Sequence, residues 1–390
     1  MHGGRWYPTL VTLADGRVLA MSGHPEKTAI VHNNAEMETF APSAWTSLGD
    51  SPDVADFDSP DPRYLYPRLF VGPTGDVFSA TPLGKQFAGD PGRSGSWNRS
   101  GVTWKRSAAP PQGIPWGAYG DYTAPAVLLP LLEDEEPARS FRFKVLFAGL
   151  GTAWITDLGT PSDPVPQPRW EVKGQARPQR LNSHLVVLAS GEVLLTGGVQ
   201  NMLQDPPDDS SVLAPQLFVF NGTDWDWATT PLSHAKVPRN YHSTALLMPD
   251  GRVFTGGSNV NSNRGYETDK PAVRRLELEI YSPWYACADR PRIISAPPSV
   301  KQGQRLFVEV RGPHPITRLA LVRAGSSTHA FNSDQRYIGL IARPGGQLNP
   351  GRYAAPIPEQ AVAVPGYYLV FACTAQHVPS KGVFVRVDPG

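Results

Sequence analysis

The sequence predicts an all-β protein, and three features support this prediction. Glycine (37) and proline (41) together make up about a fifth of the 390 residues, against a usual combined share of roughly 12%. Apolar residues come in short runs separated by turn signals, which is typical of strands. A hairpin-like segment also recurs along the chain. A length of 390 residues suits two domains.

The recurring segment is clearest at Arg239–Gly257. Its apolar runs, Leu246–Met248 and Val253-Phe254, flank Asp250-Gly251, a pair typical of hairpin turns because glycine accepts positive φ. Arg5–Gly23 and Arg180–Gly198 align with it without gaps, and Phe70–Phe78 and Phe143–Gly149 are weaker copies. This alignment places Arg5, Arg180 and Arg239 on one position and Tyr7, Asn182 and Tyr241 on another. A recurrence of roughly 50–60 residues is typical of kelch-type propeller blades, which are four-stranded sheets packed around a central channel.

Residues 1–285 are therefore expected to form a β-propeller, with five units visible. The first runs from Arg5 through outer strands at Ala35–Trp45, and the second covers Tyr64–Thr81 and is closed by Trp97–Trp104. The other three are Ala124–Asp157, Gln179–Trp227 and Arg239–Tyr281. In this arrangement equivalent positions point at a common axis, so we expect Tyr7 and Tyr241 to approach each other.

The pattern changes after Ser282–Pro291, which we interpret as a domain boundary. Residues 290–390 are expected to form an immunoglobulin-like β-sandwich, because several turn-separated strands follow within about 100 residues. The predicted strands are Arg305–Arg311, Arg318–Ala324, Gln335–Ala342, Tyr367–Thr374 and Gly382–Val387.

The charge pattern excludes several classes of partner. The net charge of +1, with 18% charged residues, gives no strong positive potential that would attract nucleic acid or an anionic membrane. No apolar run is long enough for a transmembrane helix. Met1–Gly4 leads straight into a predicted strand without a secretory signal, so localisation stays open between a cytoplasmic protein and a mature or truncated chain. Cys287 and Cys373 are most simply two buried free thiols, and a disulfide is the alternative if the fold brings them together.

Three features converge on a metal site. Tyr7 and Tyr241 are expected to face the axis, His242 follows Tyr241, and the polar loop Ser326–Arg336 carries His329. Imidazole and phenolate ligands suit a tetragonal Cu(II) site, and a phenol with a pKa of about 10 needs a metal to be bound as phenolate at neutral pH. The simpler interpretation of any one of these residues alone is packing or hydrogen bonding. We interpret His184 as structural, and the shared arginines as donors to carbonyls of the neighbouring blade.

The segments Arg239–Leu247, Ser327–Arg336 and Pro365–Phe371 resemble the galactose oxidase and glyoxal oxidase family of copper radical oxidases, and Arg5-Trp6-Tyr7-Pro8 is closer to the glyoxal oxidase branch and its bacterial relatives. The resemblance implies a seven-bladed propeller followed by a sandwich that sends a histidine into a mononuclear copper site. It implies that Tyr7 is the equatorial radical tyrosine, Tyr241 the axial tyrosine and proton acceptor, and His242 and His329 the imidazole ligands. It further implies a monomeric, secreted or periplasmic enzyme that oxidises a primary alcohol or aldehyde, carbohydrates among the candidates, with O₂ to give H₂O₂.

The chain departs from that family at one essential residue. The radical tyrosine of the family is joined by a thioether to a cysteine well upstream, and neither Cys287 nor Cys373 matches that position. The chain also shows five blade units where the family has seven. We therefore interpret the chain as N-terminally incomplete, and a propeller closed with five blades is the alternative. We expect weak or absent turnover without the crosslink. The rival function is a non-catalytic propeller and sandwich module that binds a glycan or a protein.

Overall fold

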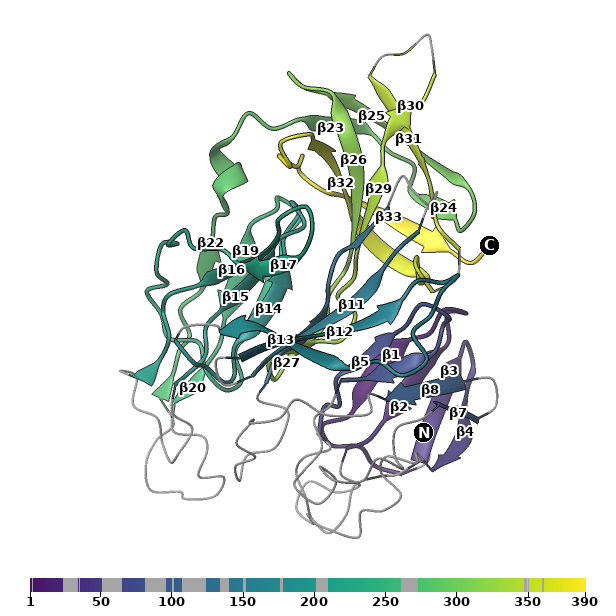
Figure 1. Ribbon diagram of the computed structural model, residues 1–390, viewed down its shortest axis with the longest axis vertical. Coiled ribbons are helices and arrows are strands. Elements are labelled where there is room, and N and C mark those ends of the chain that lie inside the picture. Colours follow the sequence, from purple (N-terminus) through teal and green to yellow (C-terminus); the bar gives the residue numbers. More distant parts are fainter. Residues whose placement is uncertain are drawn as a thin grey trace.

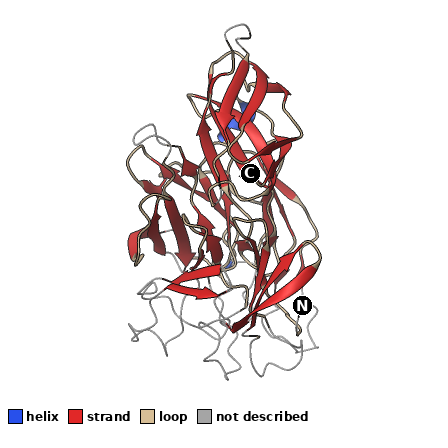
Figure 2. Cartoon of the chain, turned by 90° about the vertical axis from the view of Figure 1, so that its right-hand side faces the viewer, coloured by secondary structure: helices blue, strands red, loops and turns tan. Residues whose placement is uncertain are grey.

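The computed structural model shows an all-β protein (Figures 1 and 2). The residues that it describes are 1, 3–23, 34, 36–50, 65–80, 96–99, 102–106, 124–133, 140–149, 152–175, 178–200, 210–260, 273–346, 349, 351–359 and 361–390. Within these ranges the longest helical element is a 3₁₀ turn at Trp284–Cys287, inside the predicted boundary segment. No helix of the described part is long and apolar enough to span a membrane.

Five small sheets occupy the described part of residues 1–285. The first is β1 (Thr9–Thr12), β2 (Val18–Met21), β3 (Glu36–Ala41) and β4 (Ala44–Asp50), and the second is β5 (Leu69–Val71), β6 (Val77–Ser79), β8 (Val102–Arg106) and β7 (Ser96–Arg99). The third is β13 (Trp170–Gln175), β12 (Thr152–Gly159), β11 (Phe143–Gly149) and β9 (Ala126–Leu128). The fourth is β14 (His184–Val187), β15 (Val193–Thr196), β16 (Gln216–Phe220) and β17 (Trp225–Trp227), and the fifth is β18 (Thr244–Leu247), β19 (Val253–Gly256) and β22 (Glu279–Tyr281). A ribbon of β20 (Asn259–Val260) and β21 (Val273–Arg274) accompanies the fifth.

These sheets follow the five predicted units, except that the third sheet extends beyond the predicted limit Asp157 to β13. The strands within them pair antiparallel apart from the parallel pair β6 and β8. The predicted limits Ala35, Tyr64 and Thr81 lie outside the described residues. Figure 1 shows the fourth and fifth sheets on one side of the third and the first two on the other.

The turn glycines fix the register of the repeats. Gly16, Gly75, Gly191 and Gly251 all have positive φ at the turn between the first two strands of a sheet. One repeat position lies nine residues before each of these glycines, and it is occupied by Tyr7, Tyr66, Asn182 and His242. All four residues have left-handed backbone, with φ of 68°, 50°, 55° and 62°. The predicted gap-free alignment of Tyr241 with Tyr7 is therefore wrong by one residue, because the fifth unit carries one extra residue before its turn.

The shared arginines bind carbonyls of their own sheets. Arg5 donates to Ser22 O and Glu36 O (3.1 and 2.6 Å). Arg180 donates to Gly197 O and Ala214 O (3.3 and 2.9 Å), and Arg239 to Gly257 O and Glu277 O (2.8 and 2.5 Å). The prediction that they bind the neighbouring blade is wrong. Each guanidinium joins the end of the second strand to the segment that leads into or begins the third.

Two large sheets make up most of the described C-terminal part. One is β10 (Leu131–Leu132), β29 (Tyr337–Ile341), β26 (Ile316–Arg323), β32 (Gly366–Thr374), β33 (Val383–Asp388) and β24 (Ser299–Lys301). The other is β23 (Arg292–Ser295), β25 (Arg305–Arg311), β31 (Arg352–Pro356) and β30 (Arg343–Pro344). The five predicted strands match β25, β26, β29, β32 and β33 within one or two residues at most ends, and the others went unpredicted.

The two parts of the chain are packed together rather than merely linked. Leu131 of the third unit pairs in parallel with Ile338 of the C-terminal sheet. One core cluster joins buried side chains of both parts, Phe78 and Phe143 with Leu306 and Leu319 among them. Figure 2 shows the C-terminal strands above the smaller sheets. Both cysteines are free thiols, Cys373 buried as expected and Cys287 exposed, against the prediction.

Candidate metal centre

The structure brings the four predicted ligands together. The Tyr7 hydroxyl lies 3.0 Å from the Tyr241 hydroxyl and 3.3 Å from Nε2 of His242. The His329 ring centroid is 4.4 Å from that of Tyr7, 4.8 Å from His242 and 5.3 Å from Tyr241. Two phenols and two imidazoles from three distant parts of the sequence thus lie in contact with one another.

Irregular backbone aims three of these side chains. Tyr7 precedes β1 and His242 precedes β18, and His329 lies in the turn between β27 (Ser327–Thr328) and β28 (Phe331–Asn332). All three have left-handed backbone, His329 with φ of 45°. This conformation is uncommon outside glycine, and where it persists the surroundings hold it in place.

The loop that carries His329 is anchored on several sheets. Figure 1 places β27 among the small sheets rather than with the C-terminal strands. The side chain of Gln335 donates to Leu185 O (2.9 Å) and accepts from the Val187 amide (2.8 Å), both on β14. Thr328 Oγ1 lies 2.7 Å from Nδ1 of His329, which directs the other ring nitrogen, Nε2, away from Thr328.

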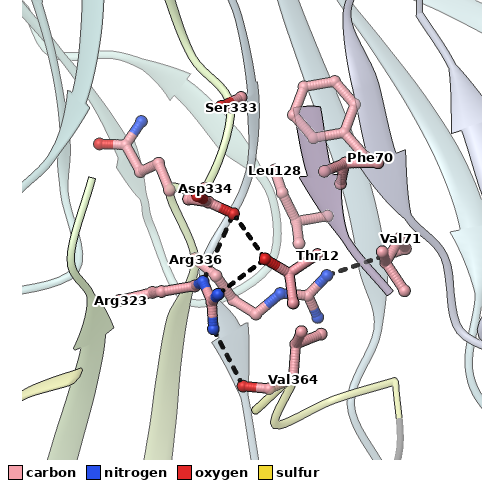
Figure 3. Close-up of a pocket in the computed structure, with 11 residues that line it drawn as sticks. Thr12, Phe70, Val71, Leu128, Arg323, Ser333, Asp334, Arg336 and Val364 are labelled. Atoms are coloured by element: carbon pink, nitrogen blue, oxygen red, sulfur yellow. Dashed lines mark hydrogen bonds and ion pairs between the residues drawn. The ribbon is translucent and has the colours of Figure 1, made fainter. Parts of the chain in front are cut away.

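Charged side chains fasten the end of the same loop around a small cavity (Figure 3). Asp334 contacts Thr12 Oγ1 (3.4 Å) and Arg323 (3.5 Å). Arg336, fully surrounded by protein, donates to Val71 O (2.9 Å). The loop is thereby tied to β1 and β5, the first strands of two different sheets.

Sequence reasoning missed two aromatic neighbours. Trp6 stacks on Tyr7, with ring centroids 4.0 Å apart. Tyr66 stacks on His329 at 4.5 Å and lies 4.8 Å from the Tyr7 ring, and its amide donates to Tyr7 O (2.9 Å). A signal for Tyr66 was present, since Tyr66-Pro67 repeats Tyr7-Pro8 at the same distance from the turn glycine.

The electrostatic environment keeps both candidate imidazoles neutral. Burial lowers the pKa of His329 to about 3, with further lowering from His242, Arg68 and His184. Burial of part of the His242 ring lowers its pKa as well, although that residue also reaches the surface. Neutral imidazole is the form that binds a metal.

His184 is not one of the four candidate ligands, and we interpreted it from the sequence as a structural residue. Its Nε2 is 2.9 Å from Ser243 Oγ in a buried hydrogen bond. Burial lowers its pKa to about 4. We interpret the residue as structural.

The donor set fits copper. In the described residues no group of three or more histidine, cysteine, aspartate or glutamate side chains is arranged to hold a metal. A metal at this site would therefore rely on the two phenols together with the two imidazoles. Nitrogen and phenolate ligands favour Cu(II), whereas calcium and magnesium prefer carboxylate and carbonyl oxygens.

The chain is similar to proteins of known families. The family model "Glyoxal oxidase N-terminus" matches residues 162–285, and "Galactose oxidase-like, Early set domain" matches residues 290–387. A galactose oxidase of Gibberella zeae is 27% identical over 406 residues, covering 99% of this chain and 55% of that protein. The aldehyde oxidase GLOX of Vitis pseudoreticulata is 28% identical over 410 residues, covering 100% of this chain and 73% of that protein.

A solved structure shows the same fold. It is described as a novel fungal alcohol oxidase of the AA5 family in complex with copper, and it superposes with a TM-score of 0.73 at 23% identity, covering 99% of this chain and 76% of that one. The chain spans about half the length of the galactose oxidases it matches.

Proposed function

Because the chain is a relative of the galactose oxidase and glyoxal oxidase proteins, we propose that it binds a single copper ion and oxidises a primary alcohol or an aldehyde with O₂ to give H₂O₂. The convergence of Tyr7, Tyr241, His242 and His329 carries this proposal. These four residues are the proposed ligands. Residues 1–285 are the proposed propeller domain and residues 290–390 the proposed sandwich domain.

The four proposed ligands would have different roles in the reaction. His242 and His329 offer neutral nitrogens, since burial disfavours their charged forms. When bound, copper supplies one-electron redox chemistry and the positive charge that favours phenolate. Tyr241 is the proposed acceptor of the substrate hydroxyl proton, and its 3.0 Å contact with the Tyr7 hydroxyl gives that proton a second oxygen nearby.

Tyr7 is the proposed radical residue, which would take hydrogen from the substrate carbon. Its ring contacts Trp6, Tyr66 and His329 rather than a cysteine. Cys373 is buried with its Sγ 3.7 Å from Ala189 O, and Cys287 lies exposed in the 3₁₀ turn. We therefore expect slow turnover from this chain, because no described cysteine lies where a thioether to Tyr7 could form.

The same observation favours the second candidate function, a non-catalytic module that binds a glycan or a protein. Such a module would keep the fold and the polar loops without oxidase activity. It would not require the two phenols and two imidazoles to meet.

The test is metal binding followed by turnover. Metal-depleted protein is titrated with Cu(II), and peroxide is then assayed with methylglyoxal and with galactose. We expect one copper per chain and slow peroxide formation. Copper binding without peroxide would support a disabled oxidase, and failure to bind copper would remove the metal site and leave the binding module.

A further inference from the structure

We propose that Arg68 is a positioning residue that holds the His329 loop, and the stacked rings of His329 and Tyr66, against the small sheets. Arg68 precedes β5 and is fully buried. The part of this inference that concerns copper rests on the proposed function. The part that concerns the loop does not.

The guanidinium of Arg68 joins three separate segments. Its Nη1 donates to Tyr66 O (2.8 Å), its Nε to Ala124 O (3.0 Å), and its Nη2 to His329 O (3.0 Å). These carbonyls belong to the second unit, to the segment before β9 of the third, and to the C-terminal loop. A planar, delocalised guanidinium fixes the relative placement of three acceptors, which the single ammonium of lysine does not.

Arg68 differs in this from the repeat arginines. The repeat arginines donate hydrogen bonds to carbonyls of their own sheets, as seen for Arg5, Arg180 and Arg239. Arg68 lies at another repeat position and reaches beyond its own sheet, to the loop 261 residues away in sequence. The main effect of the Arg68 hydrogen bonds is therefore to position that loop, whereas the repeat arginines link strands within one sheet.

The two carbonyls that matter most belong to strained residues. Tyr66 and His329 both have left-handed backbone, with φ of 50° and 45°, and Ala330 follows with 61°. Such conformations persist where several contacts over-determine them, and hydrogen bonds from a charged donor are the stronger kind. The guanidinium also lies 4.9 Å from the centroid of the Phe331 ring, next to the same turn.

A geometric consequence follows for the candidate metal site. Because one guanidinium binds the carbonyls of both Tyr66 and His329, their rings are held stacked at 4.5 Å and 24°. The turn that aims His329 at Tyr7 and His242 is fixed by the same contact. Loss of Arg68 should release His329 while leaving Tyr7, Tyr241 and His242 on their own sheets.

The test compares Arg68→Lys and Arg68→Met with matched variants of Arg180, which is also buried and donates to three carbonyls. The metal-free readout is amide hydrogen exchange of residues 326–333. We expect faster exchange in both Arg68 variants and unchanged exchange of this peptide in the Arg180 variants. Arg68→Lys keeps the buried charge and serves as the primary variant if Arg68→Met does not fold.

The copper readouts are affinity and the nitrogen hyperfine pattern of the Cu(II) electron paramagnetic resonance spectrum. Partners that orient a metal ligand typically change affinity by about 10–100-fold when removed. We expect a loss of that order in Arg68→Met, a smaller loss in Arg68→Lys, and a spectrum with one nitrogen fewer in Arg68→Met. Unchanged loop exchange in the Arg68 variants would overturn the inference, whatever copper does. Unchanged affinity and spectrum would overturn its metal part, and absence of copper binding in the unmodified protein would instead refute the proposed function.

Discussion

Replacing Gln335 with alanine tests how the His329 loop is seated on the fourth sheet. The Gln335 side chain is buried, donates to Leu185 O at 2.9 Å and accepts from the Val187 amide at 2.8 Å. Both partners are backbone groups of β14 that the substitution would leave without this contact. A buried polar group left unsatisfied costs about 1–3 kcal/mol, so two such groups predict a loss of about 2–6 kcal/mol in the free energy of unfolding.

The assay is urea unfolding of metal-free protein, with Gln302→Ala as the matched control. Gln302 is also a buried glutamine that bonds backbone, Ala363 O at 2.7 Å, but it lies in the C-terminal part away from the loop. We expect both variants to be destabilised and only Gln335→Ala to weaken copper binding. A loss below about 0.5 kcal/mol for Gln335→Ala, the range of ordinary surface substitutions, would refute the reasoning.

Gln335→Glu refines the same test through pH. The glutamate keeps an acceptor for the Val187 amide but faces Leu185 O with a second acceptor, so burial and repulsion should raise its folded-state pKa above the unfolded value of about 4.3. A raised acid pKa gives stability that is present below the unfolded pKa and lost as pH rises through the folded one. The variant should therefore be less destabilised near pH 4 than near pH 8. Equal destabilisation at both would contradict the assigned hydrogen bonds.

Three further predictions follow from the site. His329→Gln should lower copper affinity at least tenfold and remove one nitrogen from the Cu(II) spectrum, while the exposed control His314→Gln should change neither; equal spectra would show that His329 is no ligand. Burial lowers the pKa of His184 to about 4 from 6.5, so its contribution to stability is complete above pH 6.5 and is lost as pH falls toward 4. His184→Gln should therefore reduce the change in the free energy of unfolding between pH 6.5 and pH 4. An unchanged pH dependence would contradict the buried neutral state. Tyr241→Phe should retain copper but lower the rate of peroxide formation by about 10²–10⁴, the usual contribution of a general base, and a rate equal to the unmodified protein would remove its proposed role.

Local patterns were sufficient to predict the hairpin turns and five of the strands in the C-terminal part. Asp250-Gly251 and its counterparts predicted hairpins because glycine accepts the positive φ observed at Gly16 and Gly251. The strand at Arg305–Arg311 was predicted at its observed limits, and every second residue in it is buried. Repetition also predicted that Tyr7 would meet Tyr241, although 234 residues separate them.

Features that depend on tertiary contacts were not predictable in this way. The one-residue shift that puts His242 on the position of Tyr7 is not of this kind, because it follows from the distance of each residue to its turn glycine, which the gap-free alignment ignored. Leu131-Leu132 is a short apolar segment that is compatible with many partners, and its pairing with β29 depends on how the two parts of the chain pack. Arg68 carries no sequence signal for its role, because the carbonyls of Tyr66, Ala124 and His329 that it binds are backbone groups that any residue could supply.

A crystal structure of the copper-loaded protein, with copper located by its anomalous scattering, tests the central claim most directly. We expect one copper ion within bonding distance of a ring nitrogen of His242 and of His329 and of the hydroxyl oxygens of Tyr7 and Tyr241. Copper bound elsewhere on the chain, or held by fewer than both imidazoles, would contradict the assignment of these four residues as a metal centre.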